Sequence, residues 1–137
     1  MPRNLKDLST TKTIALPNGA SGSVTTADID LGSTQGNGGT DFPEETEVLI
    51  TVPALTTTML PDTRTLTIQL QNGAAATPTT AFLDAIVIAG AGGVGYAGGT
   101  FRRRVQSNAL RYLNAKFTTG ASTTDMSTLS GELALVY

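Results

Sequence analysis

The sequence predicts an all-β protein: an antiparallel jelly-roll-like sandwich of about eight strands with an extended N-terminal arm. Short apolar or alternating segments recur at intervals of roughly 10–15 residues and are separated by turns that contain Gly or Pro. No window carries apolar residues at i, i+3, i+4 and i+7 over two helical turns. A jelly roll is favoured over an immunoglobulin sandwich, because the chain has no Cys and no Trp.

Each predicted strand shows a side-chain period of two or a short apolar run between turn residues. In chain order they are Thr13–Leu16, Ser23–Leu31, Val48–Val52, Thr65–Gln71, Ala85–Ala89, Phe101–Val105, Arg111–Phe117 and Gly131–Tyr137. Val48–Val52 has apolar residues on both faces and is expected in the middle of a sheet. In Thr65–Gln71 the apolar residues Leu66, Ile68 and Leu70 are expected to face inward, and the polar residues Thr65, Thr67, Gln69 and Gln71 outward. Ala85–Ala89 is also apolar throughout and is expected to be buried.

The clearest alternation lies near the C-terminus. In Arg111–Phe117, one face carries Leu113, Ala115 and Phe117, and the other carries Tyr112, Asn114 and Lys116. In the closing segment, Leu133, Leu135 and Tyr137 share a face. This pattern is typical of half-buried antiparallel strands, so the sequence predicts a sheet built around these two segments.

The domain organisation is predicted to be an N-terminal arm, residues 1–20, and a single sandwich domain, residues 21–137. The arm is polar and has few residues that could join a core, so we expect it to lie on another protein subunit. Gly32–Thr40 has four Gly in nine residues and is expected to be a long exposed loop.

Composition excludes several classes of function. The chain has no His and no Cys, which removes Ser-His-Asp and Cys-His catalysis and His-ligated zinc. We expect no enzymatic activity, no cofactor, no nucleic-acid partner, no signal peptide and no membrane span. Charged residues make up 15%, against about 25% in average proteins. Thr is the preferred polar residue, and such a surface favours a protein packed against other protein.

One segment matches the sequence pattern of a dinucleotide-binding loop. An apolar strand runs into Gly90, Gly92 and Gly95 with the spacing G-x-G-x-x-G. A pyrophosphate site would need a helix to begin there, but Gly98 and Gly99 follow, and no acidic residue stands about twenty residues further on. The sequence therefore favours a mobile glycine loop between two strands over a nucleotide site.

Two charged clusters are candidate protein contacts: Arg102, Arg103 and Arg104, and Asp41, Glu44, Glu45 and Glu47. Guanidinium groups match carboxylates of a partner protein, although the arginines could equally be the solvated cover of a strand. The acidic cluster could face the arginines across a subunit contact, form a solvated loop or hold a calcium ion. Residues 1–62 carry eight acidic and three basic residues, whereas 63–137 carry three and six, which favours contacts between unlike surfaces.

Asp28 and Asp30 form a third acidic group, two residues apart on one predicted strand. Paired carboxylates can hydrolyse glycosidic bonds. No sequence-local feature builds a pocket around these two, however, and few aromatic residues are available to stack on a sugar.

Several segments together resemble a known family. They are Ile29–Gly32, Glu47–Val52, Arg64–Gln71, Arg111–Phe117 and Gly131–Tyr137. Their order resembles the decoration, or cementing, proteins of tailed-bacteriophage heads, especially those of short-tailed phages. The resemblance covers most of residues 24–137 and is carried by strand patterns.

The resemblance implies a jelly-roll-like protein on the outer surface of an icosahedral capsid. There it would bind the major capsid protein and a second copy of itself, with a dimer favoured over a trimer. It brings no catalytic residues. The alternative is a carbohydrate- or receptor-binding module of the virion, which would share the fold.

Overall fold

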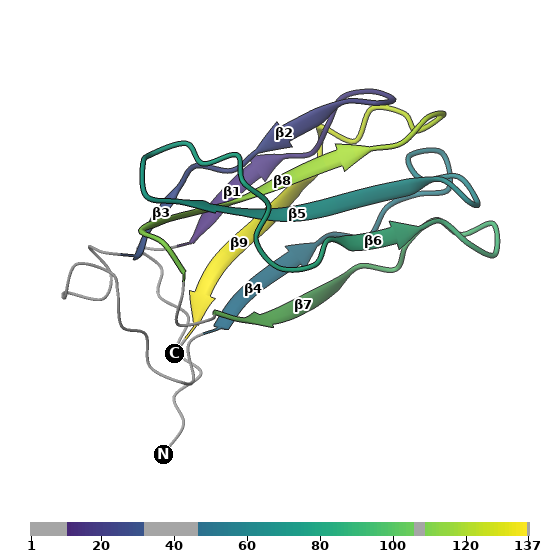
Figure 1. Cartoon of the computed structure of the whole chain (residues 1–137). Coiled ribbons are helices and arrows are strands. Elements are labelled where there is room, and N and C mark those ends of the chain that lie inside the picture. Colours follow the sequence, from purple (N-terminus) through teal and green to yellow (C-terminus); the bar gives the residue numbers. More distant parts are fainter. Residues whose placement is uncertain (1–10, 32–46, 106–108, 137) are drawn as a thin grey trace, which may run out of the picture.

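The structure is a computed structural model that describes residues 11–31, 47–105 and 109–136. Every element in this part of the chain is a strand, as predicted (Figure 1). The strands are β1 (Lys12–Ala15), β2 (Ser23–Thr25), β3 (Ile29–Asp30), β4 (Glu47–Val52), β5 (Thr65–Gly73), β6 (Ile86–Ala89), β7 (Gly99–Arg104), β8 (Tyr112–Thr119) and β9 (Ser130–Val136).

The strands form two antiparallel sheets with the topology of a jelly roll. One sheet has the order β1-β9-β4-β7, and the other has the order β2-β8-β5-β6, with β3 also paired to β8. Strands pair in nested fashion along the chain: β5 with β6, β4 with β7, β2 with β8 and β1 with β9. Such nesting is what results when one long hairpin is rolled into two facing sheets, and it confirms the predicted fold class.

The two C-terminal strands are inner strands, one in each sheet (Figure 1). β8 lies between β2 and β5, and β9 lies between β1 and β4. Phe117 of β8 and Leu133 and Leu135 of β9 are fully buried between the sheets. The alternation seen in the sequence therefore marks the centre of the core, because an inner strand has both edges paired and one face against the other sheet.

Two strand predictions need correction. Ser23–Leu31 forms two short strands, β2 and β3, which both pair with β8 and are separated by residues 26–28. Ala85–Ala89 is not a buried strand: β6 is the edge of its sheet, and Val87 is 60% exposed. An apolar run cannot reveal which of its faces the opposite sheet covers, since the other sheet meets only the side that carries Ile86 and Ile88.

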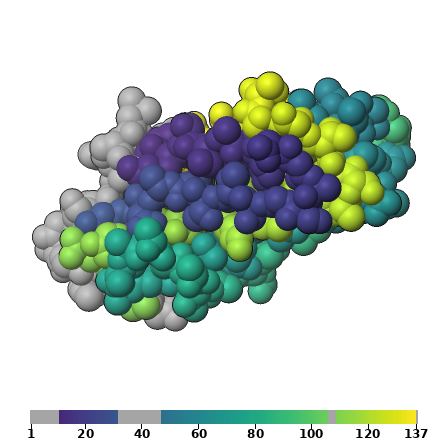
Figure 2. Space-filling view, turned by 90° about the horizontal axis from the view of Figure 1, so that it is seen from above, coloured from purple at the N-terminus to yellow at the C-terminus, as the bar shows by residue number. Residues whose placement is uncertain are grey.

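The boundary of the predicted arm is also wrong. Lys12–Ala15 forms β1, which pairs with β9 from Lys12↔Leu133 to Ala15↔Ser130. Leu16 is 1% exposed, and its amide donates to the carbonyl of Leu129. Figure 2 shows residues 11–31, purple to blue, lying along the sandwich. By pairing with β9, β1 covers a strand edge that would otherwise have unpaired backbone groups. Residues 1–10 of the predicted arm and the predicted loop 32–40 lie outside the described residues.

Candidate functional site

The arginine cluster lies on β7, at the free edge of the four-stranded sheet. Arg102 and Arg104 are exposed, and Arg103 is half-buried, in keeping with the alternation of a strand. The guanidinium of Arg103 donates to the carbonyl of Arg102 at 2.9 Å. In the part of the chain that the structure describes, Arg104 has no ion-pair partner. The cluster is therefore a positive edge that is open to solvent.

One acid of the predicted contact meets this cluster within the chain. Glu47 begins β4, stands opposite Arg104 in register and accepts a hydrogen bond from Arg102 Nη1 at 3.0 Å. The sequence hypothesis placed such a pair between subunits, and for Glu47 and Arg102 the structure places it between neighbouring strands. Both side chains are partly exposed, so the pair contributes about 0–1 kcal/mol. Asp41, Glu44 and Glu45 lie outside the described residues.

The glycine-rich segment packs against another stretch of backbone, and the helix that a phosphate-binding turn would need does not follow it. It connects β6 directly to β7, so no helix follows it. Leu55 and Tyr96 exchange two backbone hydrogen bonds, of 2.8 and 2.9 Å. A Cβ at Gly90 would lie 2.4 Å from the carbonyl oxygens of Leu60 and Pro61, and one at Gly95 would lie 2.2 Å from that of Leu55. These glycines let the segment pack directly against another stretch of backbone.

The two carboxylates Asp28 and Asp30 have separate roles. Asp30 accepts two hydrogen bonds of 2.9 Å from Arg111, which raise the pKa of that guanidinium. Asp28 Oδ2 instead accepts from the backbone amide of Thr77 at 2.6 Å, and its Oδ1 from Asn114 Nδ2 at 3.0 Å. Each carboxylate is engaged with its own partners, so the arrangement does not favour the paired-carboxylate hydrolysis considered from the sequence.

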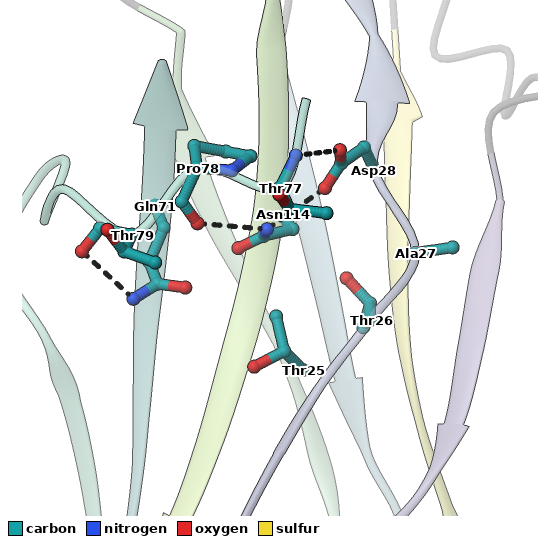
Figure 3. A pocket seen from close by; sticks show the side chains of 9 residues that line it. All are labelled: Thr25, Thr26, Ala27, Asp28, Gln71, Thr77, Pro78, Thr79 and Asn114. Atoms are coloured by element: carbon teal, nitrogen blue, oxygen red, sulfur yellow. Dashed lines mark hydrogen bonds between the residues drawn. The ribbon is translucent and has the colours of Figure 1, made fainter. Parts of the chain in front are cut away.

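Asp28 forms one wall of a pocket on the outer face of the five-stranded sheet (Figure 3). The pocket has a volume of about 470 Å³, within the usual range for small-molecule sites. Its lining comes from the β2–β3 segment, from β5 and β8, and from the β5–β6 connection: Thr25, Thr26, Ala27, Asp28, Gln71, Thr77, Pro78, Thr79 and Asn114.

The floor of the pocket is Asn114, which is 2% exposed. Its Nδ2 donates to Asp28 Oδ1 at 3.0 Å and to the carbonyl of Pro78 at 3.3 Å. Both partners are acceptors, and this fixes which end of the amide carries the nitrogen. Asn114 Oδ1 is buried and has no hydrogen-bond partner among the residues that the structure describes. An unsatisfied buried acceptor costs about 1–3 kcal/mol.

A second buried asparagine shows how the fold satisfies such a side chain when its role is structural. Asn72 Oδ1 accepts from the amide of Leu110 at 2.6 Å. Its Nδ2 donates to the carbonyls of Leu110 and Tyr112, at 2.9 and 2.8 Å. Asn72 thus uses both ends of its amide within the chain, whereas Asn114 uses only its Nδ2 among the described residues.

The sequence placed Asn114 and Gln71 on outward faces, and the structure agrees about the face. It also shows that both are buried, at 2% and 8% exposure. The β5–β6 connection covers them: Ala81 bridges to Gln71, and Gln71 Nε2 donates to the carbonyl of Thr79 at 3.2 Å. Coverage by a loop leaves no local sequence signal, so the pocket could not be found from the strand pattern.

In the described residues, no three His, Cys, Asp or Glu side chains come together as a metal site, and no helix is long and apolar enough to span a membrane. A scan of protein-family models found no match to the chain, and neither did a search of curated proteins.

Proposed function

We propose that the protein is a structural virion protein, a decoration or cement protein of a tailed-phage head. It binds the outer surface of the icosahedral capsid and stabilises contacts between major capsid subunits, as a symmetric homo-oligomer in which a dimer is favoured over a trimer. The observation that carries this proposal is a jelly roll whose free edge strand, β7, presents exposed guanidinium groups. The strand patterns that resemble the decoration proteins support it.

The edge strand β7 favours side-chain contacts over strand addition. Charged side chains on an edge strand discourage pairing with another chain. Arg104 has no ion-pair partner among the described residues and is free to bind a carboxylate of another protein. Each exposed pair contributes only about 0–1 kcal/mol. Many copies on one particle would add such weak contacts together through avidity.

Retention on capsids should fall as salt is added, because exposed ion pairs are screened. The test is sedimentation of the protein with emptied phage heads from low salt to molar salt. Arg102→Ala/Arg104→Ala should be retained less than wild type. Arg64→Ala is the control, since Arg64 is also exposed but directly precedes β5, a strand of the other sheet.

Two outcomes would count against this proposal. A protein that never sediments with heads is not a decoration protein. Retention that is independent of salt in both wild type and the double variant would show an apolar contact, with the arginines acting as solvated cover of β7.

The corrected boundary of the arm yields a matched pair of truncations. Deleting residues 2–10 should leave the melting temperature nearly unchanged and weaken capsid retention, as expected of an arm that binds in trans. Deleting residues 2–16 should also destabilise the fold, because it removes β1 and the buried Leu16. Loss of a buried leucine side chain alone costs about 2–5 kcal/mol.

Thermal melting and head sedimentation of both truncations check this prediction. If the shorter deletion unfolds the protein, residues 2–10 belong to the domain. If it leaves retention intact, they do not contact the capsid.

A further inference from the structure

We propose that the pocket over Asn114 binds a neutral, hydroxyl-rich ligand, the end of a carbohydrate chain, and that one ligand hydroxyl donates a hydrogen bond to Asn114 Oδ1. This inference is independent of the capsid-binding proposal, because it concerns the outer face of the five-stranded sheet and not the β7 edge.

The walls of the pocket are tied together by one carboxylate. Asp28 accepts from the amide of Thr77 on one side and from Asn114 Nδ2 below. Figure 3 shows these contacts joining the β2–β3 segment, β8 and the β5–β6 connection. The site is thus held by contacts between segments distant in sequence, and Asp28 and Asn114 are positioned before any ligand arrives.

The unpaired amide groups of the pocket are acceptors, so a ligand that donates hydrogen bonds would satisfy them. Asn114 Oδ1 has no partner, and Gln71 Oε1 accepts no hydrogen bond from the described residues, since only its Nε2 is engaged. Thr25 and Thr79 add exposed hydroxyls at the rim. Amide oxygens beside hydroxyls match a group that both donates and accepts, which is the property of a sugar hydroxyl. Pro78 and Ala27 supply apolar contact for the carbon-bound face of a sugar ring.

Charged ligands fit the pocket less well. None of the lining residues is Lys or Arg, so an anion would lack a counterion. A cation would meet Asp28, but both oxygens of that carboxylate already accept hydrogen bonds.

Asn114 Oδ1 lies at the bottom of the pocket, so a small outward shift of residues 77–79 would accompany binding. Two hydrogen bonds hold this segment to the floor of the pocket. The amide of Thr77 donates to Asp28, and Asn114 Nδ2 donates to the carbonyl of Pro78. The side-chain amide protons of Asn114 therefore report directly on occupancy.

The test is a titration of the full-length, isotope-labelled protein with millimolar methyl glycosides of hexoses, 6-deoxyhexoses and N-acetylhexosamines, followed by two-dimensional NMR. At least one glycoside should shift the backbone amides of residues 25–28, Thr77 and Thr79 and the side-chain amide of Asn114. Truncating Asn114 could unfold the protein, so the pocket is instead blocked from the rim. Thr79→Phe should weaken binding by at least about 10-fold, whereas Thr80→Phe, beside it but outside the lining, should leave the dissociation constant within about two-fold.

Three results would overturn the inference: no glycoside shifts these resonances; binding persists unchanged in Thr79→Phe; or methylammonium, run as a separate probe, binds more tightly than every glycoside. A long-lived water at Asn114 together with no glycoside binding would show that the pocket is only a hydration site. Because this experiment uses the isolated protein, its failure leaves the capsid-sedimentation result unaffected, and the converse also holds.

Discussion

Replacing Phe117 with alanine is expected to lower the free energy of unfolding by about 3–5 kcal/mol. Phe117 is among the largest side chains that the fold buries completely, and it lies on the inner strand β8. Its ring reaches the opposite sheet, where a Cβ on Gly131 of β9 would come within 2.7 Å of it. Removing the ring would leave a cavity where the two sheets meet. Since domains are stable by only about 5–15 kcal/mol, this loss is a large fraction of the total.

Urea denaturation measures the free energy of unfolding of Phe117→Ala, with Val87→Ala as the control. Val87 is 60% exposed on the edge strand β6, so its truncation should change stability by no more than about 0.5 kcal/mol. Equal losses in the two variants would show that the sheets do not pack through β8 and β9 as described.

Substituting alanine for Gly95 is expected to cost about 2–5 kcal/mol of folding stability. Two penalties add: Gly95 has a φ of 72°, which costs an L-residue about 1–2 kcal/mol, and its Cβ would lie 2.2 Å from the carbonyl oxygen of Leu55. Overpacking of this kind costs typically about 1–3 kcal/mol. The clash falls on backbone, so relief requires separating Tyr96 from Leu55 and breaking their two hydrogen bonds.

Gly19→Ala is the matched control for this substitution. Apart from the two chain neighbours, no heavy atom would lie within 4 Å of a methyl group at Gly19, and the φ of this residue is not positive. Its replacement should be neutral or slightly stabilising, because alanine reduces the conformational entropy of the unfolded chain. Thermal melting of both variants decides the matter. If Gly95→Ala has the same melting temperature as wild type, the segment after β6 is not held against Leu55. That result would favour the mobile glycine loop predicted from the sequence.

Local patterns in the sequence determined the class of the fold and the inward face of its best strands. Leu66, Ile68 and Leu70 alternate with polar residues and are buried as predicted. The same holds for Phe117 on β8. The side-chain period of a strand is a property of consecutive residues, so it can be identified from the sequence whatever the strand later pairs with.

Only the tertiary structure decided which strands are edges and which polar residues are covered. The sequence predicts a short strand at Thr13–Leu16 but assigns it to the arm, and it predicts Ala85–Ala89 as buried. In the structure Lys12–Ala15 pairs with β9 in the sandwich, and β6 forms an edge. Glu47 meets Arg102 across 55 positions of sequence, and Asn114 meets Asp28 across 86. Strand order and loop coverage depend on contacts between residues far apart in the chain, and a period of two carries no information about them.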